Sequence, residues 1–258
     1  MHVEVTGLIL RCVDIGESDR LISIYTREQG TVTAMVKGGK SHKNQNMAAI
    51  QQYCYSSFIL YKRGDKLWVK ESSLIESFFG IRGDLVALSL AGYIVEVLTE
   101  VSTSEGDPDL MRLALNSLYA LSEKKYGYKK VKAAFEIRAL AIIGFMPEVL
   151  ACHSCGKREG DFYFDIMGGA IQCAECKREA ELTASGVYDD GERRIVAMLS
   201  EGAKIALGYL IHCPPERIFA FNIGDEDMEL LSRATEEYLV NQLEKSFKSL
   251  EFYKEVTA

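Results

Sequence analysis

The chain has 258 residues, of which 48% are hydrophobic and 26% are charged, so its composition excludes a generally disordered protein. This length favours one large domain or about two to three small ones, with a core that needs no disulfide bonds. The formal net charge of −7, taken alone, argues against binding to nucleic acid.

The sequence contains neither a recognisable secretory leader nor a membrane span. Residues 1–4 have no basic start that leads into an apolar run, and the most apolar stretch, residues 85–95, is too short to cross a bilayer. We therefore expect a cytoplasmic protein. In that compartment the seven cysteines point to metal binding or simple burial rather than to disulfides.

Charge is distributed unevenly along the chain. Residues 1–80 carry ten basic and eight acidic side chains, whereas residues 81–258 carry 20 and 29. Residues 37–70 alone contain seven bases and a single acid, Asp65. This asymmetry is more informative than the total, and it favours an acidic ligand for the N-terminal part.

The N-terminal part predicts a small β-barrel. Val, Ile, Thr and Tyr dominate five runs that are separated by glycine-containing turns, at residues 3–15, 19–27, 31–36, 53–61 and 66–75. In the fourth run Tyr55 and Tyr61 lie on one face, and Phe58 and Leu60 on the other. Five short strands with a longer polar loop at 38–48 fit an OB-fold, and an SH3-like barrel is the alternative.

From Asp84 onward the hydrophobic spacing is helical. We expect helices at residues 85–101, 108–122, 128–143, 192–200 and 225–247. Asp107 followed by Pro108 is a typical helix start. Because helical segments flank a cysteine-rich region, the chain predicts an α+β multidomain fold: an OB-fold at 1–80, a helical domain at 81–150 and 178–258, and a zinc-binding module at 151–177.

Two Cys-x-x-Cys pairs separated by 17 residues predict a metal site. Four thiolates are soft donors that satisfy tetrahedral Zn²⁺ completely, so one structural zinc ion without an open position for catalysis is expected. The alternative is four unrelated thiols or redox pairs. The predicted ligands are Cys152, Cys155, Cys173 and Cys176.

A basic, glycine-containing loop follows the third predicted strand. Its Gly39-Lys40-Ser41 is similar to the end of a phosphate-binding P-loop, but Ala34 occupies the position where that motif needs glycine. We expect instead a flexible loop that approaches phosphate, with a solvated loop as the alternative. The neighbouring aromatic residues strengthen this interpretation, because bases of single-stranded DNA stack on aromatic rings.

A second basic cluster, residues 124–132, has five positive charges and no acid, which is compatible with an acidic partner. Catalytic arrangements are missing from the sequence. The four histidines have no serine, cysteine or carboxylate partner at a familiar spacing. We therefore expect a protein that is not an enzyme.

Two groups of short motifs occur in order along the chain. The N-terminal motifs are Gly7-Leu8-Ile9-Leu10, Gly16 to Leu21, Thr26 to Gly30 and Lys37 to Ser41. The central ones are Gly144 to Pro147, the two cysteine pairs, and Phe164 to Gly169. Together these motifs make the chain resemble the bacterial RecO family of recombination mediators over essentially its whole length.

This resemblance implies an OB-fold, a helical domain and a zinc module. It also implies binding to single- and double-stranded DNA, annealing of complementary strands, and a nucleoid-associated location. The implied partners are RecR, the acidic tail of single-stranded DNA-binding protein and, indirectly, RecA.

With these roles in mind, we expect DNA contacts on the barrel at Arg11, Arg20, Arg27, Lys37, Lys40, His42, Lys43, Lys62 and Lys66. The acidic tail of single-stranded DNA-binding protein is expected to bind at Lys129, Lys130, Lys132 and Arg138. The alternative function is a zinc-stabilised adaptor that joins proteins and touches DNA little.

Overall fold

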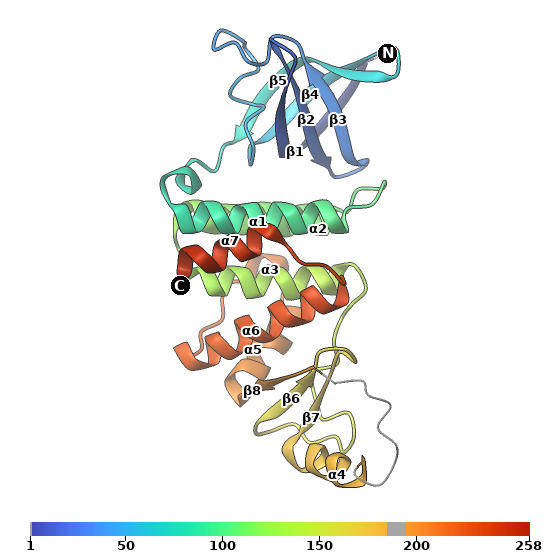
Figure 1. The fold of residues 1–258 in the computed structure, drawn as a ribbon, viewed down its shortest axis with the longest axis vertical. Helices are drawn as coiled ribbons and strands as arrows, with labels where there is room; N and C mark the ends of the chain where they lie inside the picture. The colour runs from blue at the N-terminus through green and yellow to red at the C-terminus, as the bar shows by residue number, and fades with distance from the viewer. Residues whose placement is uncertain (1, 185–194) are drawn as a thin grey trace. The chain divides into compact units, whose positions relative to one another are not determined.

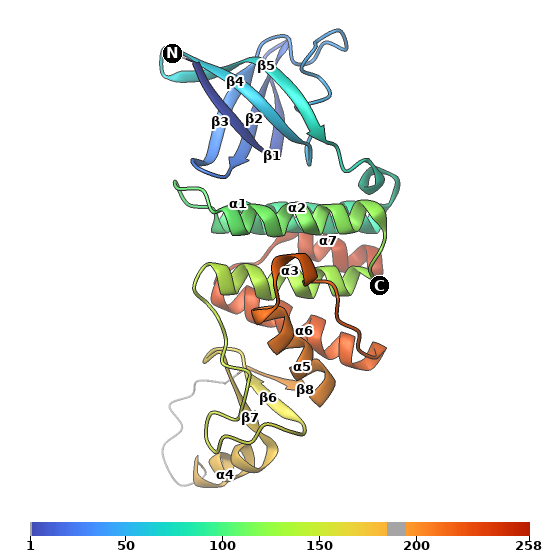
Figure 2. The same ribbon diagram turned by 180° about the vertical axis from the view of Figure 1, so that it is seen from behind.

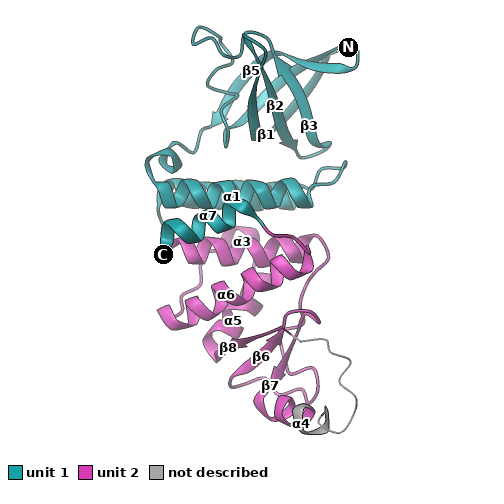
Figure 3. Cartoon of the chain, viewed as in Figure 1, with its two compact units in different colours: residues 1–125, 247–258 teal, residues 126–246 magenta. Residues whose placement is uncertain are grey.

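The computed structural model describes the backbone of residues 2–184 and 195–258, and the side chains of residues 2–180 and 195–258. The chain forms two compact units (Figure 3), one of residues 1–125 with 247–258 and the other of residues 126–246. The last helix therefore belongs to the unit that contains the N-terminal strands. Within the described part, no helix combines the length and the apolar character needed to cross a membrane.

Five N-terminal strands close into a barrel in the order β1-β2-β3-β5-β4 (Figure 1). Their bounds are β1 His2–Ile15, β2 Asp19–Thr26, β3 Gly30–Val36, β4 Tyr55–Arg63 and β5 Lys66–Glu76. Strands β3 and β5 run parallel, and the other neighbouring pairs are antiparallel. The predicted OB-fold is confirmed by this closed five-stranded barrel.

Alternate side chains of each strand fill the barrel. Phe58 and Leu60 of β4 lie in this core with Val69 of β5, as the alternation predicted. The fourth strand begins at Tyr55 rather than at Tyr53, where it was expected. Tyr53 has a φ of 69°, in the left-handed region, so the backbone turns there before the strand begins, although the Tyr53 N–H still donates to Ile9 O of β1.

Three helices complete the first unit: α1 (Leu85–Val101), α2 (Pro108–Glu123) and α7 (Lys248–Thr257). Asp84 caps α1 by accepting a hydrogen bond from the Ala87 N–H, and Asp107 caps α2, as predicted. Helix α1 packs on both α2 and α7, and Figure 2 shows α1 and α2 running alongside each other. A short 3-10 helix, Phe79–Gly83, joins the barrel to α1.

The second unit contains α3 (Tyr128–Ile142), α5 (Glu201–His212) and α6 (Asp225–Gln242). It also contains a small antiparallel sheet in the order β7-β6-β8. Helix α4 (Ala174–Ala184) follows directly after β7 in the chain. The strands are β6 Phe162–Asp165, β7 Ala170–Cys173 and β8 Val196–Leu199.

Two helix predictions are wrong. The helix expected at 192–200 is replaced by β8, whose residues pair with β6, and the helix α5 begins only after the capping residue Ser200; residues 192–194 lie outside the described part of the chain. The helix expected at 225–247 ends at Gln242, because Glu244 adopts a φ of 49° and α7 starts anew at Lys248.

Candidate functional site

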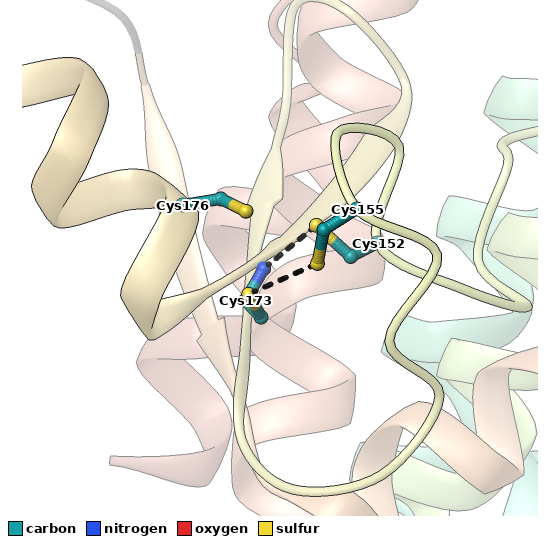
Figure 4. A group of neighbouring side chains, drawn as sticks. All are labelled: Cys152, Cys155, Cys173 and Cys176. Carbon is teal, nitrogen blue, oxygen red and sulfur yellow. Dashed lines mark hydrogen bonds between the residues drawn. The ribbon is translucent and has the colours of Figure 1, made fainter.

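The four predicted metal ligands lie together in the second unit (Figure 4). Their Sγ atoms are all within 4.8 Å of one another. Cys152 and Cys155 come from the loop after α3, Cys173 ends β7, and Cys176 lies in the first turn of α4. Residues 21 positions apart in the chain thus contribute to one cluster, as the spacing of the two pairs predicted.

Backbone hydrogen bonds hold the first cysteine pair in place. The Cys152 N–H donates to Lys157 O at 2.8 Å, and the Gly156 N–H donates to Cys152 O at 2.9 Å. Gly156 has a φ of 77°, which glycine adopts without strain, so the chain turns tightly after Cys155. The His153 N–H donates to Ile171 O at 2.9 Å and thereby fastens this turn to β7.

The electrostatics of the cluster fit a cation. Burial raises the pKa of Cys152, but N–H groups of Cys173, Cys155 and Ser154 more than offset this and lower it to about 6. The pKa of Cys176 is raised, first by its hydrogen bond with Cys155 and then by burial. Four thiols this close cannot all ionise unless a cation offsets their charge, so the donor set fits a metal that displaces their protons.

Three further cysteines lie outside this cluster. Cys54 and Cys213 are buried, and Cys12 is half-buried. Burial is the main cause that raises the pKa of Cys12 and of Cys54, which keeps both as protonated thiols at neutral pH. His153 is exposed and its ring faces the hydroxyl of Ser154, so the cluster consists of cysteines alone.

The basic loop is folded against the β1–β2 turn. The Gly38 N–H donates to the Asp19 carboxylate at 2.8 Å, and the Lys40 N–H donates to Ser18 O at 3.0 Å. The ammonium of Lys40 reaches Gly16 O at 2.8 Å and lies 3.7 Å from Asp14. These contacts fix the loop while the side chains of Lys37, His42 and Lys43 stay exposed.

The remaining cations predicted to contact DNA lie at several places on the barrel. Arg20 is half-buried and forms an ion pair with Asp14 at 3.0 Å. Lys62 and Lys66 are exposed next to the β4–β5 turn, and Arg11 is exposed on β1. Arg27 lies in the β2–β3 turn, at the opposite end of this hairpin from Arg20.

Arg27 also belongs to a tight contact within the first unit. A Cβ built on Gly106, just before α2, would lie 2.1 Å from Arg27 O, so only glycine fits there. Two exposed cations beside Lys62 and Lys66, Arg63 and Lys70, were absent from the predicted set. Arg63 is added to the candidate DNA contacts because it pairs with Lys66 across β4 and β5.

The four cations expected to hold an acidic tail all have partners within the second unit. Lys129 is exposed and ion-paired with Glu229. Lys130 donates to Phe221 O and lies over the Phe221 ring, and burial lowers its pKa. The charge of Lys129 is therefore partly neutralised within the protein, whereas the ammonium of Lys130 is held by a carbonyl oxygen.

Lys132 and Arg138 lie deeper. Lys132 is only 2% exposed and forms ion pairs with Glu136 at 3.0 Å and Glu236 at 2.8 Å. Arg138 donates to Cys213 O at 2.6 Å. Both cations thus join helix α3 to its neighbours, α6 and the segment after α5, and a partner at the surface would meet Lys129 and Lys130 first.

Comparison with known families and proteins covers nearly the entire chain. The family model described as recombination protein O N terminal matches residues 1–78, and the model described as recombination protein O C terminal matches residues 82–251. A DNA repair protein RecO from Acetivibrio thermocellus is 32% identical over 256 residues, which cover 98% of this chain and 96% of that protein.

Two further relatives have the same description. The DNA repair protein RecO of Alkaliphilus metalliredigens is 26% identical over 99% of this chain and 100% of its own. The DNA repair protein RecO of Anaeromyxobacter sp. strain Fw109-5 is 31% identical over 94% of this chain and 93% of its own. With an N-terminal five-stranded barrel, a helical part and a four-cysteine cluster also in place, the chain belongs to the RecO family of DNA repair proteins.

Proposed function

We propose that this protein is a recombination mediator that binds single- and double-stranded DNA and anneals complementary strands, without catalysing a reaction itself. The observation that carries the proposal is the basic loop of the barrel. Its backbone is fixed against the β1–β2 turn, whereas Lys37, His42 and Lys43 extend into solvent, where phosphates are accessible. Such lysines neutralise phosphates and release counterions.

The DNA-binding surface proposed here includes this loop and the β4–β5 turn. The cations of the loop, with Lys62 and Lys66, form its main part, because they are exposed. Arg11 and Arg27 would be reached only by a strand that continues along the barrel. Asp14 partly offsets the charge of Arg20 in an ion pair, so we expect Arg20 to attract phosphate less strongly.

The four-cysteine cluster is proposed to hold one structural Zn²⁺. Four thiolates close the coordination sphere, so no position remains for a catalytic water. The metal would fasten the loop after α3 to β7 and α4. The predicted separation of residues 151–177 as a zinc module within a helical domain is retained as part of this proposal.

The partners are proposed from family membership. The protein would act in the cytoplasm with RecR to help RecA load onto strands coated by single-stranded DNA-binding protein, whose acidic tail it would bind. Lys129 and Lys130 carry the tail proposal, since Lys132 and Arg138 are engaged inside the unit. Lys129→Glu with Lys130→Glu is expected to weaken binding of the tail peptide, and unchanged affinity would refute this site.

Annealing of two labelled complementary oligonucleotides tests the central proposal. Purified, zinc-loaded protein is expected to accelerate annealing at low salt, with an effect that fades as salt rises. If folded protein gives no acceleration at low salt, the adaptor function takes its place. The next experiment would then be a search for protein partners.

A further inference from the structure

The outer surface of the barrel has an aromatic strip on β4 and β5. Leu67 and Val69 of β5 pack with the barrel core, so Trp68 between them points outward. Leu60 of β4 is also in the core, so Tyr61 points outward as well. Tyr61 and Trp68 are directly paired across the two strands, and both are partly exposed.

The strip extends onto the neighbouring strand β3. Met35 is the partner of Trp68 in the parallel pairing of β3 with β5. It points outward because Ala34 and Val36 face the core, yet it is only 8% exposed. Neighbours on the outer face therefore cover Met35, which gives Trp68 an apolar cross-strand neighbour.

Cations surround this strip. Arg63 and Lys66 are the next cross-strand pair on the same face as Tyr61 and Trp68, and both are exposed. Neither forms an ion pair with any residue that the structure describes. Lys37 follows β3 two residues after Met35 and is exposed too.

The acids near the strip are few. Asp65 lies in the β4–β5 turn, Glu71 is 3.7 Å from Lys70, and Glu4 lies opposite Ile59. The bases at the turn end of the strip, Arg63 and Lys66, therefore retain a net positive charge, and Lys37 adds a cation at the opposite end, because β3 and β5 run parallel. This combination of aromatic rings and unpaired cations suits a ligand with flat faces and negative charge.

The indole N–H of Trp68 is buried and has no hydrogen-bond partner among the described residues. A ligand outside the protein cannot reach this nitrogen, so it would contact only the exposed part of the Trp68 ring.

We propose that Trp68 and Tyr61 form a stacking platform for the bases of single-stranded DNA, with Arg63, Lys66 and Lys37 holding its phosphates. This inference rests on the DNA binding proposed above and assigns the part of the barrel that receives unpaired bases. Duplex DNA has no exposed base faces, so it would use the cations and not the rings.

Trp68 is the only tryptophan in the chain, so its fluorescence reports on this platform alone. Full-length, zinc-loaded protein is titrated with fluorescein-labelled oligothymidylate at low salt, and tryptophan emission and label anisotropy are recorded in parallel. Stacking is expected to quench the emission in step with the rise in anisotropy. A rise in anisotropy without quenching overturns the platform and leaves DNA binding intact. No rise at low salt overturns both.

Substitutions separate stacking from indirect quenching. Trp68→Leu and Tyr61→Leu, which keep apolar volume and lose the ring, are each expected to weaken oligothymidylate binding by about five- to one-hundred-fold. Trp68→Phe is expected to retain most of the affinity. Tyr119→Leu removes an exposed ring from α2 and is the matched control, with unchanged binding.

Thermal unfolding of each variant verifies that it folds. If Trp68→Leu proved unstable, Tyr61→Leu and the emission of the unmodified protein would still decide the question. Wild-type affinity in folded Trp68→Leu or Tyr61→Leu protein overturns the platform. Affinity for duplex DNA is expected to change less than twofold in both leucine variants, because duplex DNA does not use the rings.

Discussion

The carboxylate of Glu96 in α1 caps the last helix of the chain by accepting hydrogen bonds from Ser249. The Ser249 N–H donates to Glu96 Oε2 at 3.0 Å, and the Ser249 hydroxyl donates to the same oxygen. The N-cap residue of α7, Phe247, makes no capping hydrogen bond through its side chain. A charge from α1 thus satisfies donors at the positive end of α7 and joins residues 153 positions apart.

Glu96→Ala is expected to lower the free energy of unfolding by about 1–2 kcal/mol, because N–H groups in the first turn of α7 lose their acceptor. Urea unfolding followed by circular dichroism measures this loss, and hydrogen exchange of residues 248–257 measures local opening of α7. The control is Glu123→Ala, an exposed acid at the end of α2, for which little change is expected. Unaltered protection of α7 in Glu96→Ala would contradict the capping role.

Lys132→Met is expected to be strongly destabilising, by about 3–5 kcal/mol, since it leaves Glu136 and Glu236 without their buried cation. The pKa of Glu136 is already raised, chiefly by burial, although Lys132 counteracts this. Chemical denaturation measures the loss, and Lys129→Met is the control because its ion pair with Glu229 is exposed.

The pH dependence of Lys132→Met follows from the same carboxyl. A raised pKa in the folded state means that the folded protein holds the proton more tightly than the unfolded chain, so stability falls as pH rises through that pKa. Without Lys132 the pKa rises further. The destabilisation of Lys132→Met is therefore expected to be smaller at pH 5 than at pH 8, and an equal loss at both values would show that Glu136 is not the source.

The sequence was sufficient for features that depend on local order. Alternating apolar residues and glycine turns predicted the barrel, and the spacing of the cysteine pairs predicted their cluster. The sequence was insufficient where the structure of a segment or the burial of a side chain depends on partners that are distant in the chain. The four-residue strand β8 exists because β6 pairs with it, and Lys132 is buried because Glu236 lies about 100 residues away in sequence but beside it in the fold.

Zinc is expected at one ion per chain, and elemental analysis of the purified protein measures it. Cys173→Ser should lose the metal and lower the melting temperature, because three thiolates hold the ion less tightly and the loop after α3 is released from β7. Cys213→Ser, which alters a buried cysteine outside the cluster, should keep its zinc. Full metal content in Cys173→Ser would refute the four-cysteine site.

Metal retention should also depend on pH. The pKa of Cys155 and that of Cys176 are raised, so protons compete with the metal for these sulfurs. Zinc affinity is therefore expected to fall as pH is lowered, since acid protonates the thiolates that the ion needs. Competition with a chromogenic chelator between pH 6 and 8 measures this trend, and an affinity independent of pH would argue against thiolate ligation.

The salt dependence of DNA binding counts the phosphates that the loop neutralises. For single strands the logarithm of the affinity falls with the logarithm of salt concentration by about 0.7 per contact. Lys37→Ala with Lys43→Ala removes two exposed cations and leaves in place the backbone contacts that fold the loop, so the slope should become shallower by about 1.4. Fluorescence anisotropy at several salt concentrations measures it, with Lys248→Ala in α7 as a control that keeps the original slope. A double variant with weaker binding but the original slope would mean that these lysines shape the loop without touching phosphate.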